Sequence, residues 1–140
     1  MKIFPAITFI LLTVISTSAI STDLDGTVTH VRDGDTIEVS NIPIRLTGVS
    51  APELNEPLGI VSKKFMRELV LGKPIHCELN MTKTYDRLVG ICYIGGEDIG
   101  ASIIKAGLAL DCPRYSGGLY AGIEIASGRD RIKLPRYCRK

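Results

Sequence analysis

The order of strand-like and helix-like segments is the feature that most limits the fold of this chain. Alternating apolar residues predict strands, and apolar residues spaced three or four apart predict helices. These patterns predict three strands, a helix, two strands and two helices, at residues 27–31, 36–39, 42–46, 57–72, 75–79, 88–94, 97–106 and 119–126. Five short strands with a helix between the third and fourth are typical of an OB-type barrel. We therefore expect an α+β domain that is mainly β: a five-stranded OB-type barrel with about three helices.

Two local patterns refine this expectation. Ser40 and Asn41 separate two alternating runs and predict a tight hairpin turn. Helix 57–72 has an apolar stripe that should face the core. The residues of this stripe are Leu58, Val61, Phe65 and Leu69.

The first 21 residues are typical of an export signal. Lys2 is their only charge, an apolar run extends from Ile7 to Ile15, and small residues follow as far as Ala19. This is the pattern of a secretory signal peptide. An uncleaved anchor is the alternative, because about 20 uncharged residues just span a bilayer. We expect cleavage, a mature domain at residues 22–140, a secreted or periplasmic location, and no membrane association afterwards.

Four cysteines lie beyond this segment, namely Cys77, Cys92, Cys112 and Cys138. An even number in a small exported chain predicts two disulfides. Three pairings are possible. We favour Cys77–Cys92 with Cys112–Cys138, because these close short loops and the first two cysteines fall in neighbouring strands. A zinc site is the alternative, although no two cysteines have the spacing of a zinc half-site.

Composition excludes some classes without identifying a function. With 45% hydrophobic and 23% charged residues, the chain is neither disordered nor collagen-like. Its net charge of +2 is too small to establish a nucleic-acid partner. Composition alone would fit any α+β domain, so function must be inferred from local clusters.

Two short segments carry the residue types that phosphodiester cleavage needs. Asp33 and Asp35 lie on a tight turn, Arg45 lies on a strand, and Glu53 follows at the end of the next strand segment. Hard cations take oxygen ligands on adaptable loops. Cleavage needs a metal, guanidinium donors and a carboxylate that holds water. The turn is not an EF-hand, because Glu38 stands where that loop requires glycine.

Four motifs in order resemble the staphylococcal-nuclease-like (thermonuclease) family. They are Asp33-Gly34-Asp35-Thr36, Ile44-Arg45-Leu46 with Ala51-Pro52-Glu53, Tyr85-Asp86-Arg87 and Gly107-Leu108-Ala109, within about residues 26–115. The resemblance implies an OB barrel with three helices. It also implies calcium-dependent hydrolysis of DNA or RNA that leaves 3′-phosphates.

The resemblance implies roles for individual residues. The implied catalytic residues are Arg45 and Arg87, which would clamp the scissile phosphate, and Glu53, which would position or deprotonate the attacking water. The implied metal-site residues are Asp35, its neighbour Asp33, Ser50 and the backbone carbonyl of Ala51. The implied nucleotide-contacting residues are Tyr85 and Tyr115.

Two positions depart from the family pattern. Ser50 replaces an aspartate, which predicts a weak Ca²⁺ site with a dissociation constant of about 10⁻⁴–10⁻³ M. Asp86 replaces a glycine, and an ion pair between Asp86 and Arg87 would weaken the phosphate clamp.

The leading hypothesis is an exported, monomeric nuclease that uses Ca²⁺ and acts on nucleic acid. The alternative, favoured by Ser50 and Asp86, is a non-catalytic OB-fold module that binds nucleic acid or another polyanion. A third reading is an exported scaffold that acts on cell-surface polymers. His30 and His76 are assigned no role, and the basic residues after Arg129 are interpreted as a solvated tail.

Overall fold

The structure, a computed structural model, describes residues 22–140. The expected signal peptide and its cleavage site lie outside the described residues. The strands are β1 Thr22–Val31, β2 Thr36–Val39, β3 Ile42–Leu46, β4 Val49–Ser50, β5 Pro74–Thr84, β6 Arg87–Ile94, β7 Glu97–Asp98 and β8 Leu110–Asp111. The α-helices are α1 Gly59–Val70, α2 Ile99–Lys105, α3 Pro113–Ser116 and α4 Ala126–Arg131. The chain also forms two 3₁₀ turns, η1 Ala121–Ile123 and η2 Arg136–Cys138.

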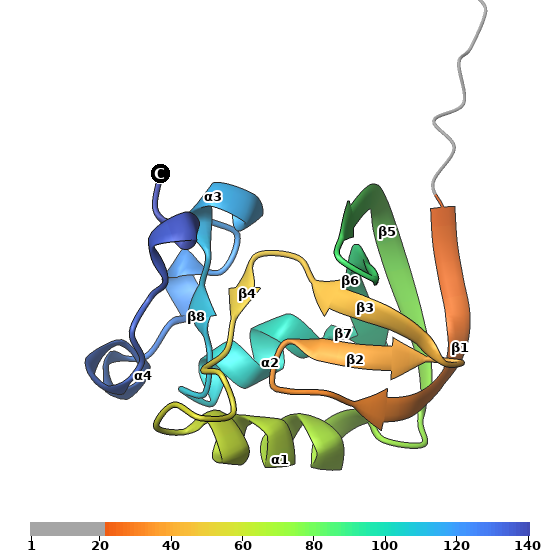
Figure 1. The fold of residues 1–140 in the computed structure, drawn as a ribbon, viewed down its shortest axis with the longest axis horizontal. Helices are drawn as coiled ribbons and strands as arrows, with labels where there is room; N and C mark the ends of the chain where they lie inside the picture. The colour runs from red at the N-terminus through yellow and green to blue at the C-terminus, as the bar shows by residue number, and fades with distance from the viewer. Residues whose placement is uncertain (1–21) are drawn as a thin grey trace, which may run out of the picture.

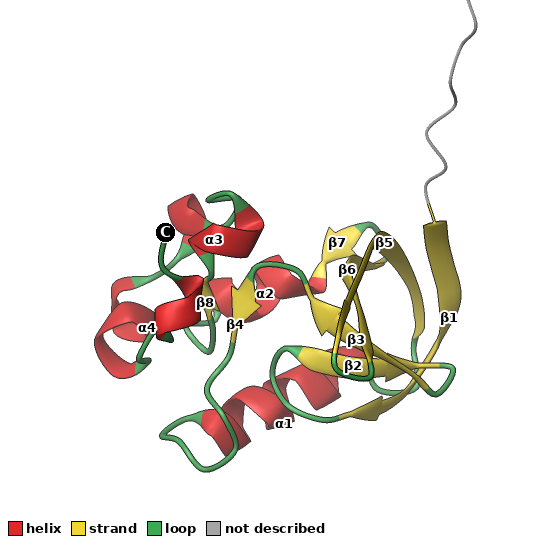
Figure 2. Ribbon diagram, turned by 45° about the horizontal axis from the view of Figure 1, so that its top comes forward, coloured by secondary structure: helices red, strands yellow, loops and turns green. Residues whose placement is uncertain are grey.

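The curled sheet in Figures 1 and 2 has six strands, of which the short β7 pairs only with β6. Within it, β1 pairs antiparallel with both β2 and β5. The hairpins β2–β3 and β5–β6 extend it, and β3 runs parallel to β6 from the Ile44–Leu88 pair to the Leu46–Gly90 pair. These pairings follow the order β1-β2-β3-β6-β5, the arrangement of a partly open OB-type barrel. The expected α+β, mainly β fold class is confirmed.

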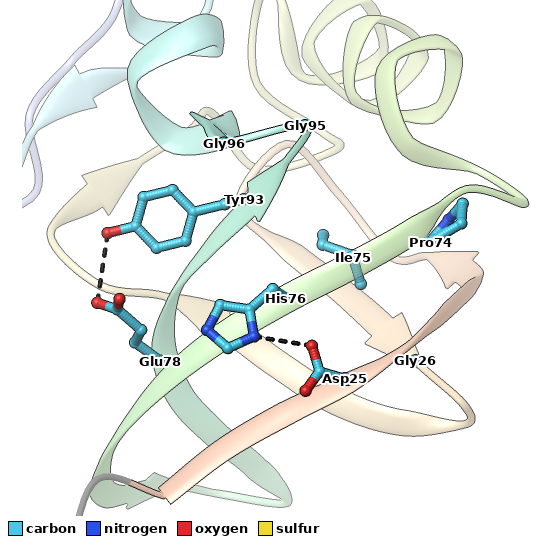
Figure 3. A pocket seen from close by; sticks show the side chains of 9 residues that line it. All are labelled: Asp25, Gly26, Pro74, Ile75, His76, Glu78, Tyr93, Gly95 and Gly96. Carbon is cyan, nitrogen blue, oxygen red and sulfur yellow. Dashed lines mark hydrogen bonds and ion pairs between the residues drawn. The ribbon is translucent and has the colours of Figure 1, made fainter.

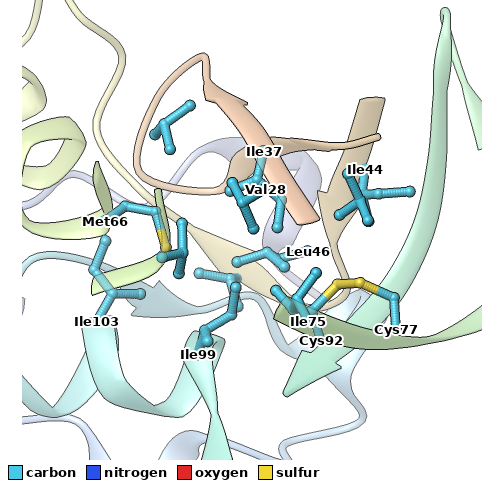
Figure 4. Packing of buried hydrophobic residues seen from close by; sticks show 14 of the residues in the cluster. Val28, Ile37, Ile44, Leu46, Met66, Ile75, Cys77, Cys92, Ile99 and Ile103 are labelled. Atoms are coloured by element: carbon cyan, nitrogen blue, oxygen red, sulfur yellow. A yellow bond between two sulfur atoms is a disulfide. The ribbon is translucent and has the colours of Figure 1, made fainter. Parts of the chain in front are cut away.

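One hydrophobic core joins this sheet to α1 and α2, as Figure 4 shows. Ile37 and Ile44 contribute from the β2–β3 hairpin, Met66 from α1 and Ile103 from α2. The Ser40–Asn41 turn that closes the hairpin has positive φ at both residues, 48° and 66°, as predicted for a tight hairpin. The core therefore fixes β2 and β3, which lead into the cavity described below.

The expected apolar stripe of α1 is confirmed in part: Phe65 and Leu69 are half-buried and pack against the core, but the most buried face is shifted by one residue. The buried face consists of Gly59, Ser62, Met66 and Val70, whereas Val61 is 50% exposed. Ser62 can be buried because its hydroxyl donates to the carbonyl of Leu108 at 2.7 Å. A search for apolar residues alone does not find Gly59 and Ser62, although both lie on the buried face of the helix.

The helix expected at residues 119–126 was also wrong. Only η1 forms within that range, and α3 and α4 lie on either side of it. Tyr120 is buried and its hydroxyl donates to Asp98 at 2.7 Å, while the Glu124 carboxylate accepts from the backbone of Asp111 at 2.7 Å. These tertiary contacts hold the segment in an irregular path. The described chain has four short α-helices where about three were expected.

Both favoured disulfides are confirmed. Cys77 and Cys92 face each other directly on β5 and β6 inside the core. Cys112, after β8, is bonded to Cys138 in η2 and so attaches the C-terminal turn to the helical end of the molecule. No free cysteine remains among residues 22–140, so the zinc alternative has no thiolate ligands there. Within the same residues, no helix is long and apolar enough to cross a membrane.

Candidate active site

A cavity of about 670 Å³ gathers most of the predicted site residues. It lies where the β2–β3 hairpin, the β5–β6 turn and the C-terminal segments meet. The predicted residues that line it are Asp33, Asp35, Arg45, Glu53, Tyr85, Arg87 and Tyr115. Ser50 and Ala51 are not among its lining residues. Segments far apart in the sequence therefore place charged side chains around one shared space.

Asp35 is the buried acid of this cavity. Its carboxylate accepts from the Ala51 backbone N–H at 2.8 Å and from the Thr36 hydroxyl at 3.2 Å, and it forms a 3.1 Å ion pair with Arg45. The Asp33 carboxylate accepts from the backbone N–H of Asp35 at 3.0 Å, which fixes the turn. Burial raises the pKa of Asp35 to about 7; Arg45 opposes this rise and Asp33 adds to it.

Ser50 and Ala51 lie next to this acid, on the strand side. Ser50 is buried in β4 and pairs with Leu110 of β8. The N–H of Ala51 is used to hold Asp35. Within residues 22–140, no three His, Cys, Asp or Glu side chains form a group that could hold a metal ion. The donor set still suits a hard cation, because two adjacent carboxylates in one cavity repel each other and a cation offsets that repulsion.

Arg45 is fixed by the backbone around it. Its Nη1 donates to the carbonyls of Asp35, Leu46 and Val49 at 3.4, 3.1 and 2.7 Å. The side chain is only 15% exposed. Arg45 does not pair with Glu38 across the hairpin, because Glu38 binds Arg32. Arg45 is thus a rigid positive group in the cavity wall.

Arg87, the first residue of β6, lines the same cavity as Arg45 and makes fewer hydrogen bonds to the backbone. Its Nε donates to the Thr84 carbonyl at 3.3 Å, its Nη1 donates to the Thr36 hydroxyl at 3.2 Å, and its guanidinium lies 5.7 Å from the ring centroid of Tyr85. Its Nη2 has no hydrogen-bond partner in the described part of the chain. This leaves an arginine donor available to an anion in the cavity.

Asp86 forms its ion pair with Arg32 and not with Arg87. Two hydrogen bonds, of 3.2 and 2.9 Å, join its carboxylate to Arg32, whose Nε also donates to Glu38 at 2.8 Å. The Arg32 guanidinium lowers the pKa of Asp86. The charge of Asp86 is therefore paired with Arg32 outside the cavity, and Arg87 keeps its hydrogen bond to Thr36.

Glu53 lies on an exposed loop that is packed tightly against the start of α1. Its backbone N–H donates to the Glu56 carboxylate at 2.8 Å, and its carbonyl accepts from the Glu56 N–H at 2.9 Å. A Cβ on Gly59 would overlap the Glu53 carbonyl. Only glycine at position 59 lets the helix approach this loop so closely.

Sequence reasoning missed several residues of the cavity. Thr36 received no role and does not line the cavity, but its buried hydroxyl contacts two residues that do, Asp35 and Arg87. Thr47 places a buried hydroxyl in the cavity wall, and this hydroxyl has no partner within residues 22–140. Cys112 and Tyr137 also line the cavity, and no local motif could have indicated them.

A second, shallower cavity of about 520 Å³ lies on the outer face of β1, β5 and β6 (Figure 3). His76, which received no role from the sequence, pairs there with Asp25 at 2.8 Å and with Asp23 at 3.7 Å. The Tyr93 hydroxyl donates to Glu78 at 3.4 Å. None of the predicted site residues lines this second cavity.

An OB-type barrel whose main cavity carries two arginines and three carboxylates is a domain suited to a phosphate-bearing ligand. Residues 43–120, more than half of the chain, match the family described as staphylococcal nuclease homologue. The chain belongs to this family.

Curated relatives agree with this assignment. An Escherichia coli protein named "uncharacterized endonuclease" is 32% identical over 120 residues, which cover 82% of this chain and 76% of the relative. A Haemophilus influenzae protein with the same name is 29% identical over 94 residues, or 64% of this chain and 53% of the relative. The succinoglycan biosynthesis protein ExoI of Rhizobium meliloti is 33% identical over 106 residues, or 67% and 56%. Family membership supports a nuclease function and a nucleic-acid substrate.

Proposed function

We propose that this chain is an exported, Ca²⁺-dependent nuclease that hydrolyses phosphodiester bonds of DNA or RNA. The observation that carries the proposal is the arrangement of Arg45, Arg87, Asp35 and Glu53 around one cavity. Two disulfides suit an oxidising compartment. We also propose that residues 1–21 are the export signal, that residues 22–140 are the mature domain, and that it acts as a monomer.

Each charged group has a task that fits its surroundings. The free Nη2 of Arg87 donates to a phosphate oxygen, while Thr36 and Thr84 hold the rest of the guanidinium. Arg45 adds fixed positive charge that stabilises the negative charge developing on the phosphate. Glu53, on its packed loop, accepts a proton from the attacking water. Tyr85 and Tyr115 line the path of the nucleotide.

Asp35 and Asp33 would hold Ca²⁺, which polarises a phosphate oxygen when bound. The proposed site has two carboxylates, with Ser50 in place of a third. Since ligand charge sets affinity, we expect binding at the weak end of the calcium range, about 10⁻⁴–10⁻³ M. The Ala51 backbone supports the site by holding Asp35.

The test is degradation of a plasmid and of a single-stranded RNA by the purified mature chain. We expect cleavage in millimolar Ca²⁺ and protection by chelator. Arg45→Ala and Arg87→Ala should each lower kcat by about 10²–10³-fold, as the loss of a charge-stabilising donor does. Lys64→Ala is the control, because Lys64 is exposed on α1 and its ion pair is with Glu68. Equal rates for all four proteins would refute the proposed site.

The alternative, a non-catalytic binding module, is favoured by the burial of Ser50 away from the cavity lining. The same preparations distinguish it. Retardation of a single strand in a gel, without cleavage at any Ca²⁺ concentration, would support the module and contradict the nuclease.

A further inference from the structure

The C-terminal 3₁₀ turn η2 brings a tyrosine into the main cavity. Tyr137 lies in the middle of η2 and lines the same cavity as Arg45 and Glu53. Tyr137 is about half exposed, at 49%. Position 137 lies outside every motif that suggested the site.

A covalent link holds this turn in place. Cys138, directly after Tyr137, is fully buried and bonded to Cys112, which itself lines the cavity. The backbone N–H of Cys138 donates to the Pro135 carbonyl at 3.1 Å, which closes the turn. The disulfide and this hydrogen bond hold the backbone that carries Tyr137.

Tyr137 shares the cavity with the charged residues Arg45, Asp35 and Glu53. Burial raises the pKa of Tyr137, Arg45 lowers it, and Asp35 and Glu53 raise it. A tyrosine hydroxyl is protonated at neutral pH and can donate one hydrogen bond. The residues that act on it are those proposed to surround the phosphate.

The other two tyrosines of the cavity each have a ring that lies near an arginine guanidinium. The Tyr85 ring, 93% exposed, lies against the Arg87 guanidinium, and Tyr115 lies 6.0 Å from the guanidinium of Arg114. Both offer an aromatic face, which suits a base or sugar. Tyr137 lines the cavity beside Arg45, Asp35 and Glu53.

We propose that Tyr137 is a further substrate-contacting residue, whose hydroxyl donates a hydrogen bond to a phosphate oxygen of the bound strand, and that the Cys112–Cys138 disulfide positions it there. This inference rests on the proposed function, because it concerns the same cavity. It assigns to the C-terminal turn a part in the site rather than a purely structural role.

The test compares Tyr137→Phe, which removes only the hydroxyl, with Tyr93→Phe, which removes a hydroxyl from the separate outer cavity. A hydrogen bond to a charged group contributes about 1.5–3 kcal/mol, so Tyr137→Phe should lower kcat/KM by about 10- to 100-fold. It should also weaken the binding of a labelled short oligothymidine strand, measured in chelator so that nothing is cut. Tyr93→Phe should match the wild type in both measurements.

The disulfide is tested by the double variant Cys112→Ala/Cys138→Ala. We expect a similar loss of strand binding, and little further loss when Tyr137→Phe is added, because both changes act through one hydroxyl. Circular dichroism and a melting curve report whether the fold is kept. A fully additive triple variant would overturn the assigned role of the disulfide.

Other outcomes are equally decisive. If Tyr137→Phe binds and cleaves like the wild type, the inference is wrong. If only Tyr137→Ala loses binding, the ring acts by packing and the hydroxyl assignment is wrong. If the wild type binds the strand but never cuts it, the nuclease proposal fails, while the binding comparison still tests Tyr137.

Discussion

Thr36 connects the acidic and basic halves of the main cavity through a single hydroxyl. It donates to Asp35 and accepts from Arg87, each at 3.2 Å, and the side chain is fully buried. A hydroxyl has one hydrogen to donate and lone pairs to accept. This side chain therefore fixes the orientation of both charged groups at once.

We expect Thr36→Val to lower kcat/KM by about tenfold, because each lost hydrogen bond contributes about 1 kcal/mol and Arg87 loses its support. Thr36→Ser should restore most of the activity, since it keeps the hydroxyl. Initial rates on a defined oligonucleotide measure both. A valine variant as active as the serine variant would show that the hydroxyl is not needed.

His76 gives the fold a local dependence on pH. Its hydrogen bond to Asp25 raises its pKa above the usual 6.5, and Asp23 adds to the effect. The protonated form is favoured by folding, so this contribution to stability is complete below pH 6.5 and is lost as the pH rises through the raised pKa.

The variant Asp25→Asn should melt at a lower temperature than the wild type at pH 6, and the difference should shrink toward pH 8. An NMR titration of the His76 ring in both proteins gives the pKa directly. A pKa that is the same in both would contradict the assigned pair.

At the scale of elements, the close approach of α1 to the Glu53 loop depends on Gly59. We expect Gly59→Ala to destabilise the fold by about 1–3 kcal/mol, the usual effect of overpacking. It should also lower kcat, because the loop that carries Glu53 must move. Urea denaturation and single-turnover rates measure the two effects. Ser102→Ala is a control for activity, because Ser102 is a half-buried residue of α2 that does not line the cavity.

Strand order and the first hairpin could be predicted because they depend on local alternation and turn residues. The Ser40–Asn41 turn and the five barrel strands are such cases. The buried face of α1 could not be predicted in the same way, because Ser62 is buried through a hydrogen bond to the carbonyl of Leu108, far along the chain. The irregular path around Tyr120 and Glu124 likewise depends on partners in other elements.

For the whole molecule, the Cys77–Cys92 bond contributes to global stability. It closes a loop of 15 residues, which in the chain-entropy model is worth about 3 kcal/mol. Cys77→Ala/Cys92→Ala should therefore lose at least about 3 kcal/mol in urea denaturation, because the variant also loses buried sulfur contacts. The comparison is the wild-type chain unfolded in urea under reducing conditions. If its unfolding midpoint equalled that of the oxidised wild type, this role would be contradicted.

The site as a whole was only partly accessible to sequence reasoning. Motifs indicated Asp35, Arg45, Glu53 and Arg87, because residues close in sequence or repeated in a known pattern can be recognised. Tyr137 was not indicated, since its place depends on a disulfide between two segments that no motif connects. The partner of Asp86 was equally hidden, because Arg32 lies on a separate strand end.

The Arg32–Asp86 pair has an evolutionary consequence. An acid at position 86 next to Arg87 is compatible with the cavity here because Arg32 binds it. In an alignment of the family, acids at position 86 should co-occur with a cation at position 32. A cation at position 32 need not be accompanied by an acid at position 86. Arg32 also pairs with Glu38, and this pair remains when residue 86 is glycine.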